Sequence, residues 1–525
     1  MVASRLSLIR RSIFGHGPRS ALHPGAALPD WLPALLGVSF GLVAALLIVG
    51  GQWIFLVPLG AIVPAAILFL RYPFVAVILW IVIFPYFVIT PTPSFRIMYW
   101  LLHRAMIPGA LAIVILGDWL GLRQREPVRF GRAELFMLIF VLLAIANIML
   151  LTPRPAQTLV RFYDRLFVPL CMYWLVRLIA PTTRDLSRLA WAGSITIVVE
   201  AIIGLLGWFV PQTLPEHWLN RIGERTVGTF GNPAVYTSTL LFLALLLLQY
   251  GMQSRSRGRR VLTLAMLGLA YLGVFFSFSR GSWLGALLVW LGLLLVYPAT
   301  MRRWTIVVAL IGLPVISVVL AQEMSWATER LGDQDTAKGR VLGAATSINM
   351  IERRPWLGWG FDTYDLYDEQ FKTRVADLAV REEQTSHNTY LLFIAEMGAV
   401  SLVLYMLPVV WWLLLSRKVW HRLPGHGFLS WHLLVLLWLL LLDHFTVSNF
   451  MDMIQSNLFG TTIWWLALGL IASLISTHLA PGDIGPPRWT RQPRRALAVE
   501  RATPPGLIEQ HEYAHDMRRS KGPKR

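Results

Sequence analysis

The sequence predicts an all-α fold, a polytopic transmembrane helical bundle of about 12–14 spans with one large, partly helical outer loop. Of the 525 residues, 56% are hydrophobic and only 14% are charged, whereas soluble domains carry about 25% charged residues. Apolar runs of about 20 residues, long enough to cross a bilayer, recur along the chain. Between two of these runs lies the polar stretch 322–386, which is too polar for a bilayer core and too long for a simple connector.

The chain begins with a polar segment, residues 1–30. Four arginines lie in it, but no apolar core follows until Trp31, so we expect a cytoplasmic segment and not a cleaved signal. Transmembrane helices are expected over 31–321 and 387–478, separated by the loop 322–386. Hydropathy places fourteen spans at roughly 31–50, 53–70, 73–90, 99–117, 134–151, 162–180, 189–210, 234–250, 261–278, 282–298, 304–321, 388–416, 428–445 and 457–478.

The arginines indicate how the spans are oriented. With the N-terminus inside, the predicted inner loops hold the basic groups, and the loop 322–386 carries eight Lys and Arg against twelve Asp and Glu. This is the positive-inside pattern, and it places both ends in the cytoplasm. The basic tail 479–525 is rich in proline and arginine and is expected to be disordered. The net charge of +18 therefore needs no nucleic-acid partner.

Two classes of feature are absent from the sequence. The single cysteine, Cys171, excludes an internal disulfide. No internal repeat is evident, so the inverted-repeat architecture of many secondary transporters has no support.

Four arginines fall at predicted outer ends of spans. Arg221 and Arg225 lie in a segment with three glycines and a proline, Arg280 lies between two spans, and Arg340 opens an amphipathic stretch expected at the membrane surface. The guanidinium group pairs bidentately with phosphate oxygens, so the set suits a phosphate or diphosphate. The alternative for each arginine is snorkelling at the interface or a loop salt bridge.

His387 is the main candidate for catalysis. Thr385 and Ser386 are N-cap residue types, which predicts that His387 lies in the first helical turn, where the positive helix end favours a neutral imidazole. Gly398 lies eleven residues later, on the same face of a regular helix, and permits close packing or a substrate groove. The alternative is an interfacial histidine that only caps a loop.

Weaker signals come from charged residues at other places. Glu200 and Glu396 lie within predicted spans, where acids are functional candidates by default but also pair or become protonated. The group Arg161, Asp164 and Arg165 either extends an anionic site or pairs internally. Asp333 and Asp335 match a two-carboxylate metal pattern, although a solvated turn is favoured for them.

Several of these stretches, in order, resemble motifs of the O-antigen ligase and polymerase superfamily. The stretches are Arg225 with Gly228-Thr229-Phe230-Gly231-Asn232-Pro233, Ser279-Arg280-Gly281-Ser282-Trp283, Gly339-Arg340, Ile351 to Gly360, and His387-Asn388-Thr389-Tyr390 followed by Glu396-Met397-Gly398. They cover roughly residues 220 to 415 and surround the large loop. Ala234 departs from the asparagine that often follows Asn-Pro in this superfamily, and the basic tail is not part of the pattern.

The resemblance implies a GT-C-like bacterial inner-membrane glycosyltransferase with a periplasmic site. It implies a donor glycan linked to undecaprenyl diphosphate and an acceptor that is a glycan or lipid A core. His387 would be the general base of an inverting transfer, supported by Asn388 and Gly398. The diphosphate would be held by Arg340 and, with less direct correspondence, by Arg225 or Arg221, and Arg280 is a further candidate for the same role from its place at the outer end of two spans. The resemblance implies no cofactor and no metal.

The sequence leaves the exact activity open. A ligase, a polymerase and a protein O-oligosaccharyltransferase share these motifs and differ in the acceptor. A flippase for the same lipid would also need arginines for the diphosphate, but it would place charges through the middle of the membrane. A purely structural scaffold gives no reason for the arginines and His387 to gather on one side.

Overall fold

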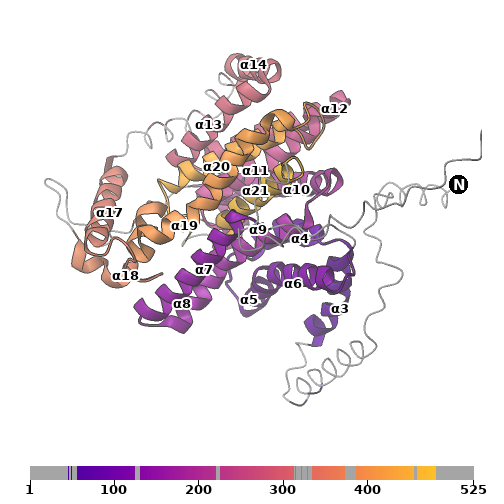
Figure 1. Cartoon of the computed structure of the whole chain (residues 1–525). Coiled ribbons are helices and arrows are strands. Elements are labelled where there is room, and N and C mark those ends of the chain that lie inside the picture. Colours follow the sequence, from indigo (N-terminus) through magenta and orange to yellow (C-terminus); the bar gives the residue numbers. More distant parts are fainter. Residues whose placement is uncertain are drawn as a thin grey trace, which may run out of the picture. The chain divides into compact units, whose positions relative to one another are not determined.

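In the computed structural model, residues 56–123, 130–219, 225–312, 334–372, 386–454 and 458–479 are described, together with a few single positions between 45 and 328. These residues form helices and turns, with no strand among them (Figure 1). The α-helices are α3 (Leu56–Arg71), α4 (Phe74–Ile83), α5 (Pro93–Tyr99), α6 (Met106–Trp119), α7 (Arg132–Leu151), α8 (Pro155–Phe162), α9 (Val168–Ile179), α10 (Thr183–Phe209), α11 (Pro233–Met252), α12 (Arg257–Phe276), α13 (Arg280–Val296), α14 (Pro298–Val307), α17 (Gln334–Arg353), α18 (Tyr364–Tyr367), α19 (Thr389–Val419), α20 (Trp431–Ser448) and α21 (Leu458–Ser476).

Eight helices of the described residues are long and apolar enough to cross a membrane. A ninth candidate is the pair Pro64–Arg71 and Phe74–Phe87, which is bent by 114°. The expected number of 12–14 spans is therefore not confirmed. The first expected span, 31–50, lies almost wholly outside the described residues, and the span expected at 282–298 is the shorter helix α13.

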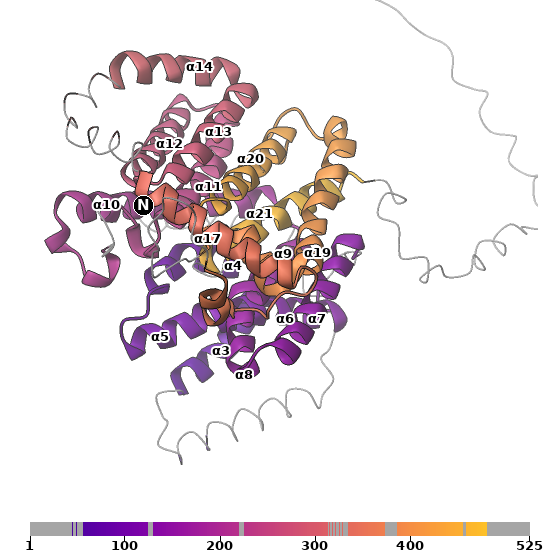
Figure 2. The ribbon, with the colours of Figure 1, turned by 90° about the vertical axis from the view of Figure 1, so that its left-hand side faces the viewer.

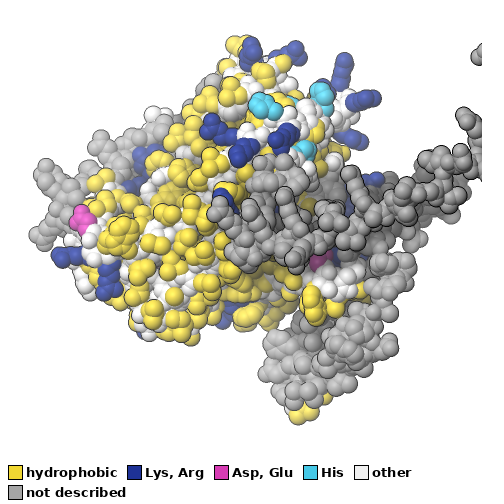
Figure 3. All heavy atoms as spheres, in the orientation of Figure 1, with side chains coloured by type: hydrophobic (Ala, Val, Ile, Leu, Met, Phe, Trp, Pro, Cys, Tyr) yellow, Lys and Arg dark blue, Asp and Glu magenta, His cyan; other side chains and the backbone are white. Residues whose placement is uncertain are grey.

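Two helices lie at the centre of the bundle, α11 and α21. Nearly every side chain of both is buried, as expected for helices that are apolar around their whole circumference. α11 packs against α10, α12, α13, α20 and α21, and α21 packs against α9, α19 and α20. The surrounding helices present many exposed leucine, isoleucine and valine side chains, which form the broad hydrophobic surface seen in Figure 3. Such a surface suits a lipid environment.

Two of the helical segments are interrupted by π-helical turns. Trp100–Ala105 joins α5 to α6, and Tyr163–Phe167 joins α8 to α9. The two turns face each other, because Arg104 Nε donates to Asp164 Oδ1 at 2.6 Å and His103 Nε2 lies 2.9 Å from the carbonyl oxygen of Asp164. Asp164 thus pairs with Arg104, and not with Arg161 or Arg165 as the sequence had suggested as one alternative.

The described part of the outer loop is mostly helical. α17 crosses the ends of several bundle helices, near α19 (Figure 2). One face of α17 is buried, where Met350 packs in a cluster with Tyr364, Leu392 and Ala395. The opposite face leaves Val341 and Ile348 exposed, which fits the expectation of an amphipathic helix.

α19 is divided by Gly398, which has φ 79° and ψ 166°. The helix therefore consists of a short part that begins at Thr389 and a longer part after the break. The prediction that Gly398 and His387 lie on one face of a continuous helix was wrong for this reason, since a residue outside helical geometry ends the helical periodicity.

Candidate functional site

His387 precedes α19 by two residues. The N-cap of α19 is Asn388, whose side-chain oxygen accepts hydrogen bonds from the backbone N–H groups of Tyr390 at 2.9 Å and Leu391 at 3.0 Å. The prediction that Ser386 or Thr385 caps the helix was wrong, because Asn388 satisfies these two N–H groups instead. His387 consequently lies just outside the helix, open to solvent on one side and partly covered by its neighbours, at the positive end of the helix dipole.

The start of α19 is held by the loop that follows α20. Asn388 Nδ2 donates to the carbonyl oxygen of Asn449 at 3.4 Å, and Thr389 Oγ1 donates to that of Met451 at 2.8 Å. The backbone N–H of Met453 donates to Thr389 Oγ1 at 2.8 Å. These bonds fix the backbone that directly follows His387, so the expected supporting role of Asn388 has a structural basis.

Two of the predicted arginines lie near His387. Partial burial, followed by the charges of Arg340 and Arg225, lowers the pKa of the His387 imidazole below its ordinary value of 6.5. Two cations disfavour a third positive charge close by, so the imidazole stays neutral and able to accept a proton at near-neutral pH. The structure therefore brings together residues that are 162 positions apart in the sequence (387 minus 225).

Phe450 lies close both to Arg340 and to the start of α13, the helix that begins with Arg280. The guanidinium carbon of Arg340 lies 5.9 Å from the centre of the Phe450 ring. A Cβ atom at Gly281, the neighbour of Arg280, would lie 3.0 Å from the Cβ of Phe450. Arg280 is the first residue of α13 and is partly buried. The start of α13 and the turn of α17 that carries Arg340 thus both lie close to the side chain of Phe450.

The segment that carries Arg225 is held by a buried acid. Glu200, in α10, accepts hydrogen bonds from the backbone N–H and the hydroxyl of Thr229 at 3.0 and 2.6 Å. Gly228 has φ 55°, and a Cβ there would overlap the carboxylate of Glu200. Glu200 therefore holds the Gly-rich turn that follows Arg225. Arg221 lies outside the described residues.

The backbone of residues 355–360 packs closely against the break in α19. The N–H of Ala399 donates to the carbonyl oxygen of Pro355 at 2.9 Å, and the N–H of Gly360 donates to that of Glu396 at 2.7 Å. A Cβ at Gly398 would overlap the carbonyl group of Trp356. Of the two roles predicted for Gly398, close packing is the one that these contacts show.

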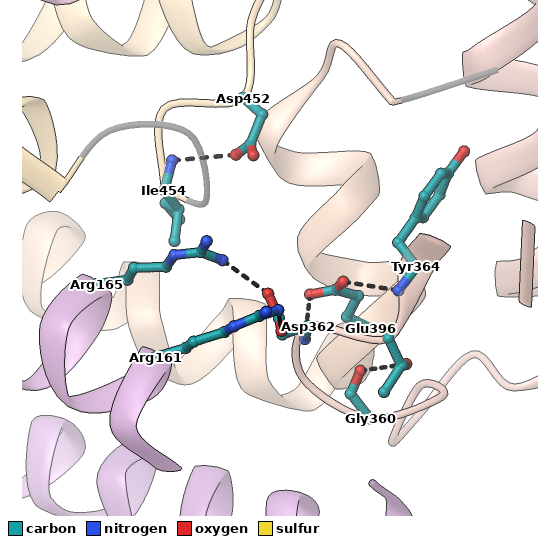
Figure 4. A network of polar contacts seen from close by, with 9 residues as sticks. Arg161, Arg165, Gly360, Asp362, Tyr364, Glu396, Asp452 and Ile454 are labelled. Atoms are coloured by element: carbon teal, nitrogen blue, oxygen red, sulfur yellow. Dashed lines mark hydrogen bonds and ion pairs between the residues drawn. The ribbon is translucent and has the colours of Figure 1, made fainter. Parts of the chain in front are cut away.

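Glu396 binds the outer segment directly. Its carboxylate accepts hydrogen bonds from the backbone N–H groups of Asp362 at 2.9 Å and Tyr364 at 3.0 Å (Figure 4). The side chain of Asp362 in turn pairs with Arg161 and with Arg165, whose Nη1 lies 2.8 Å from Asp362 Oδ1. We call these five residues, Arg161, Arg165, Asp362, Tyr364 and Glu396, the outer clasp. The outer clasp joins helices far apart in the chain.

Some of these residues were not predicted from the sequence. Asp362 lies shortly after Gly358-Trp359-Gly360 and is one of twelve acids in the loop. Only Arg161 and Arg165, four positions apart in another segment, hint at its role. Phe450 has no local signal at all, because its importance depends on two distant helices. Asp333 and the side chain of Asp335 lie outside the described residues.

Comparison with known families agrees with this assembly. Residues 263–406 match the family model described as O-antigen ligase. The match runs from α12 into α19, so it includes Arg280, Arg340 and His387, whereas Arg225 lies before it. No curated protein matches the chain in a sequence search. Over residues 263–406, therefore, this multi-pass membrane protein is similar to O-antigen ligases, and the resemblance that its motifs predict is confirmed there.

Proposed function

We propose that the protein is a membrane glycosyltransferase of the O-antigen ligase type. It transfers a glycan from undecaprenyl diphosphate to a hydroxyl group of lipid A core or another surface acceptor, at the periplasmic face of the bacterial inner membrane. The observation that supports the proposal is the proximity of Arg340 and Arg225 to His387, whose pKa is lowered by partial burial and by the charges of these two arginines.

In the proposed reaction, the acceptor hydroxyl attacks the anomeric carbon of the donor sugar. The new glycosidic bond forms as the bond between that carbon and the diphosphate oxygen breaks, with inversion. An imidazole nitrogen of His387 takes the hydroxyl proton, and the diphosphate leaves with the bonding electrons. A positioned general base contributes about 10²- to 10⁴-fold to the rate of such a step.

The arginines stabilise the leaving group. Arg340 and Arg225 offer planar guanidinium groups that match diphosphate oxygens, and Arg280 and Arg221 complete the proposed set. Negative charge develops on the diphosphate as the bond breaks, so preorganised cations lower the energy of the transition state more than that of the bound substrate. Partial burial, together with the same cations, lowers the pKa of His387, which favours the neutral imidazole before the reaction.

The test uses purified full-length protein, an undecaprenyl-diphosphate-linked donor, a lipid A core acceptor and EDTA. We expect metal-independent formation of one glycosylated acceptor. A ladder of longer lipid-linked products without the acceptor would instead identify a polymerase, and transfer to a protein hydroxyl would identify a protein O-oligosaccharyltransferase. Movement of labelled lipid across vesicles without any transfer would replace the proposal with a transporter.

A further inference from the structure

The outer clasp connects the two residues on which the proposed reaction depends. Arg340 lies in α17, and His387 lies just before α19. The two helices are not adjacent in the chain, since residues 354–388 separate them. Their spacing is therefore set by non-covalent contacts, both the packing of Met350 in α17 against Leu392 and Ala395 in α19 and the contacts of the segment between the helices.

The contacts form a continuous path from α19 to α17. The N–H of Tyr364 donates to Glu396, in the first part of α19. The hydroxyl of the same tyrosine lies 3.3 Å from the carbonyl oxygen of Gly343 and 3.2 Å from Ser347 Oγ, both in α17. Gly343 is three residues, about one helical turn, from Arg340. Tyr364 therefore links the helix part that follows His387 to the turn that carries Arg340.

The two arginines anchor this path to the bundle. Arg161, at the end of α8, and Arg165, in the adjoining π-helical turn, both pair with Asp362, whose side chain is only 9% exposed. Asn147 of α7 adds two bonds to the same segment, one to the carbonyl oxygen of Leu357 at 2.7 Å and one from the N–H of Phe361 at 3.1 Å. The side chains of Arg165 and Arg161 are 24% and 45% exposed, and hydrogen bonds between ionised groups of this kind are strong and direction-specific.

We propose that the outer clasp is a positioning device, in which Asp362, Tyr364 and Glu396 set the place of Arg340 relative to His387. This inference rests on the proposed function for its kinetic consequences. In this proposal, Arg161 and Arg165 bind Asp362 and do not bind the substrate. If the outer clasp is weakened, α17 moves. The donor diphosphate, which Arg340 would hold, is then no longer correctly positioned relative to His387.

The first experiment needs no activity. Hydrogen exchange of full-length protein in detergent is compared between the wild type and Asp362→Asn. We expect faster exchange in α17, with α21 unchanged as an internal reference. The matched control is Asp368→Asn, an acid in the same outer segment for which the described structure records no ion pair. Exchange of α17 at the wild-type rate in Asp362→Asn would overturn the inference, whether or not the protein is a transferase.

The second experiment measures kcat/KM for glycan transfer as a function of pH. Glu396→Gln and Tyr364→Phe are expected to lower kcat/KM by about 10- to 100-fold, since a shift of ~1 Å at a reacting group has effects of this size. The charged groups that act on His387 are Arg340 of α17 and Arg225 beside α11. When Arg340 moves away, the acid limb of the profile shifts to higher pH. Loss of rate without this shift would show a merely structural role and overturn the inference.

A double-mutant comparison decides the role of the arginines. If Arg165 acts through Asp362, Arg165→Gln combined with Asp362→Asn loses no more activity than the worse single variant. If Arg165 binds substrate independently, the two losses multiply, and the assignment is wrong. Absence of transfer by the wild type would count against the proposed function alone, because the exchange experiment tests the clasp separately.

Discussion

At the scale of single residues, the account depends on charge and hydrogen-bond geometry around His387. The imidazole lies beside two guanidinium groups, and its neighbours Asn388 and Thr389 are tied to the loop after α20. A lowered pKa and a fixed adjoining backbone are two features that general-base catalysis requires, so both support the role proposed for His387.

Arg340 is expected to be sensitive to the shape of its side chain as well as to its charge. Arg340→Ala should lower the rate of transfer from the lipid-linked donor by roughly 10- to 100-fold, from the 1.5–3 kcal/mol typical of charge-assisted hydrogen bonds. Arg340→Lys should recover little of this loss, because a point charge does not reproduce the bidentate fork. Initial rates at several donor concentrations measure both effects, and wild-type rates in Arg340→Ala would remove the assignment.

The pH dependence tests the electrostatic coupling. His387 must be neutral to accept a proton, so kcat/KM falls as the pH drops through the pKa of the imidazole. Burial and the charges of Arg340 and Arg225 lower this pKa, and the acid limb of the wild type should therefore lie below pH 6.5. Arg340→Gln removes one cation and should shift the acid limb to higher pH. An acid limb in the same place for both proteins would contradict the coupling.

At the scale of elements, the break in α19 is the feature on which the outer segment depends. The turn from Pro355 to Gly360 pairs with backbone groups freed at Gly398. The same turn contains Gly358, with φ 66°, packed against the carbonyl oxygen of Glu396. Two glycines are needed because two backbones approach without room for a Cβ on either side.

Gly398→Ala is expected to lower the melting temperature and the transfer rate together. A side chain there is strained by the positive φ and overlaps Trp356, and the cost of such strain is about 1–3 kcal/mol. The matched control is Gly268→Ala in α12, where a Cβ would meet nothing within 4 Å. Thermal unfolding in one detergent compares the two, and equal melting temperatures for both variants would contradict this role of Gly398.

The same elements show how far prediction from the sequence reaches. The expected spans at 234–250 and 261–278 coincide with α11 and α12, because an apolar run of about 20 residues is a local signal. The prediction for Arg340, His387 and Arg225 was possible because unusual cations and glycines mark the outer ends of spans. The pairing of Asp362 with Arg161 and Arg165 joins residues about 200 positions apart, and no local pattern selects that acid from its neighbours.

At the scale of the whole molecule, the basic side chains are unevenly placed. Figure 3 shows Lys and Arg gathered mainly at the end of the protein near α12 and α14. α17 and α18 lie away from that end, next to α19 (Figure 1). We infer that the end near α12 and α14 faces the cytoplasm, which is the orientation that the positive-inside pattern predicts.

Cysteine labelling tests this orientation. Cys171 is buried, so replacing it with serine gives a quiet background for single-cysteine variants. Gln370→Cys, in the outer segment, should react with a membrane-impermeant maleimide in cells with a permeable outer membrane. Gly425→Cys, between α19 and α20, should react only after the inner membrane is opened. The opposite pattern would place the site on the cytoplasmic face and contradict the proposed orientation.

The central claim is that His387 is the base of a glycosyl transfer. The most direct measurement is the rate of glycan transfer from an undecaprenyl-diphosphate-linked donor by purified wild type and His387→Ala, with EDTA present and with folding checked by thermal unfolding. The account predicts turnover by the wild type and a loss of at least about 10²-fold in a folded His387→Ala protein. Equal turnover by the two proteins would show that His387 is structural and that the proposed chemistry is wrong.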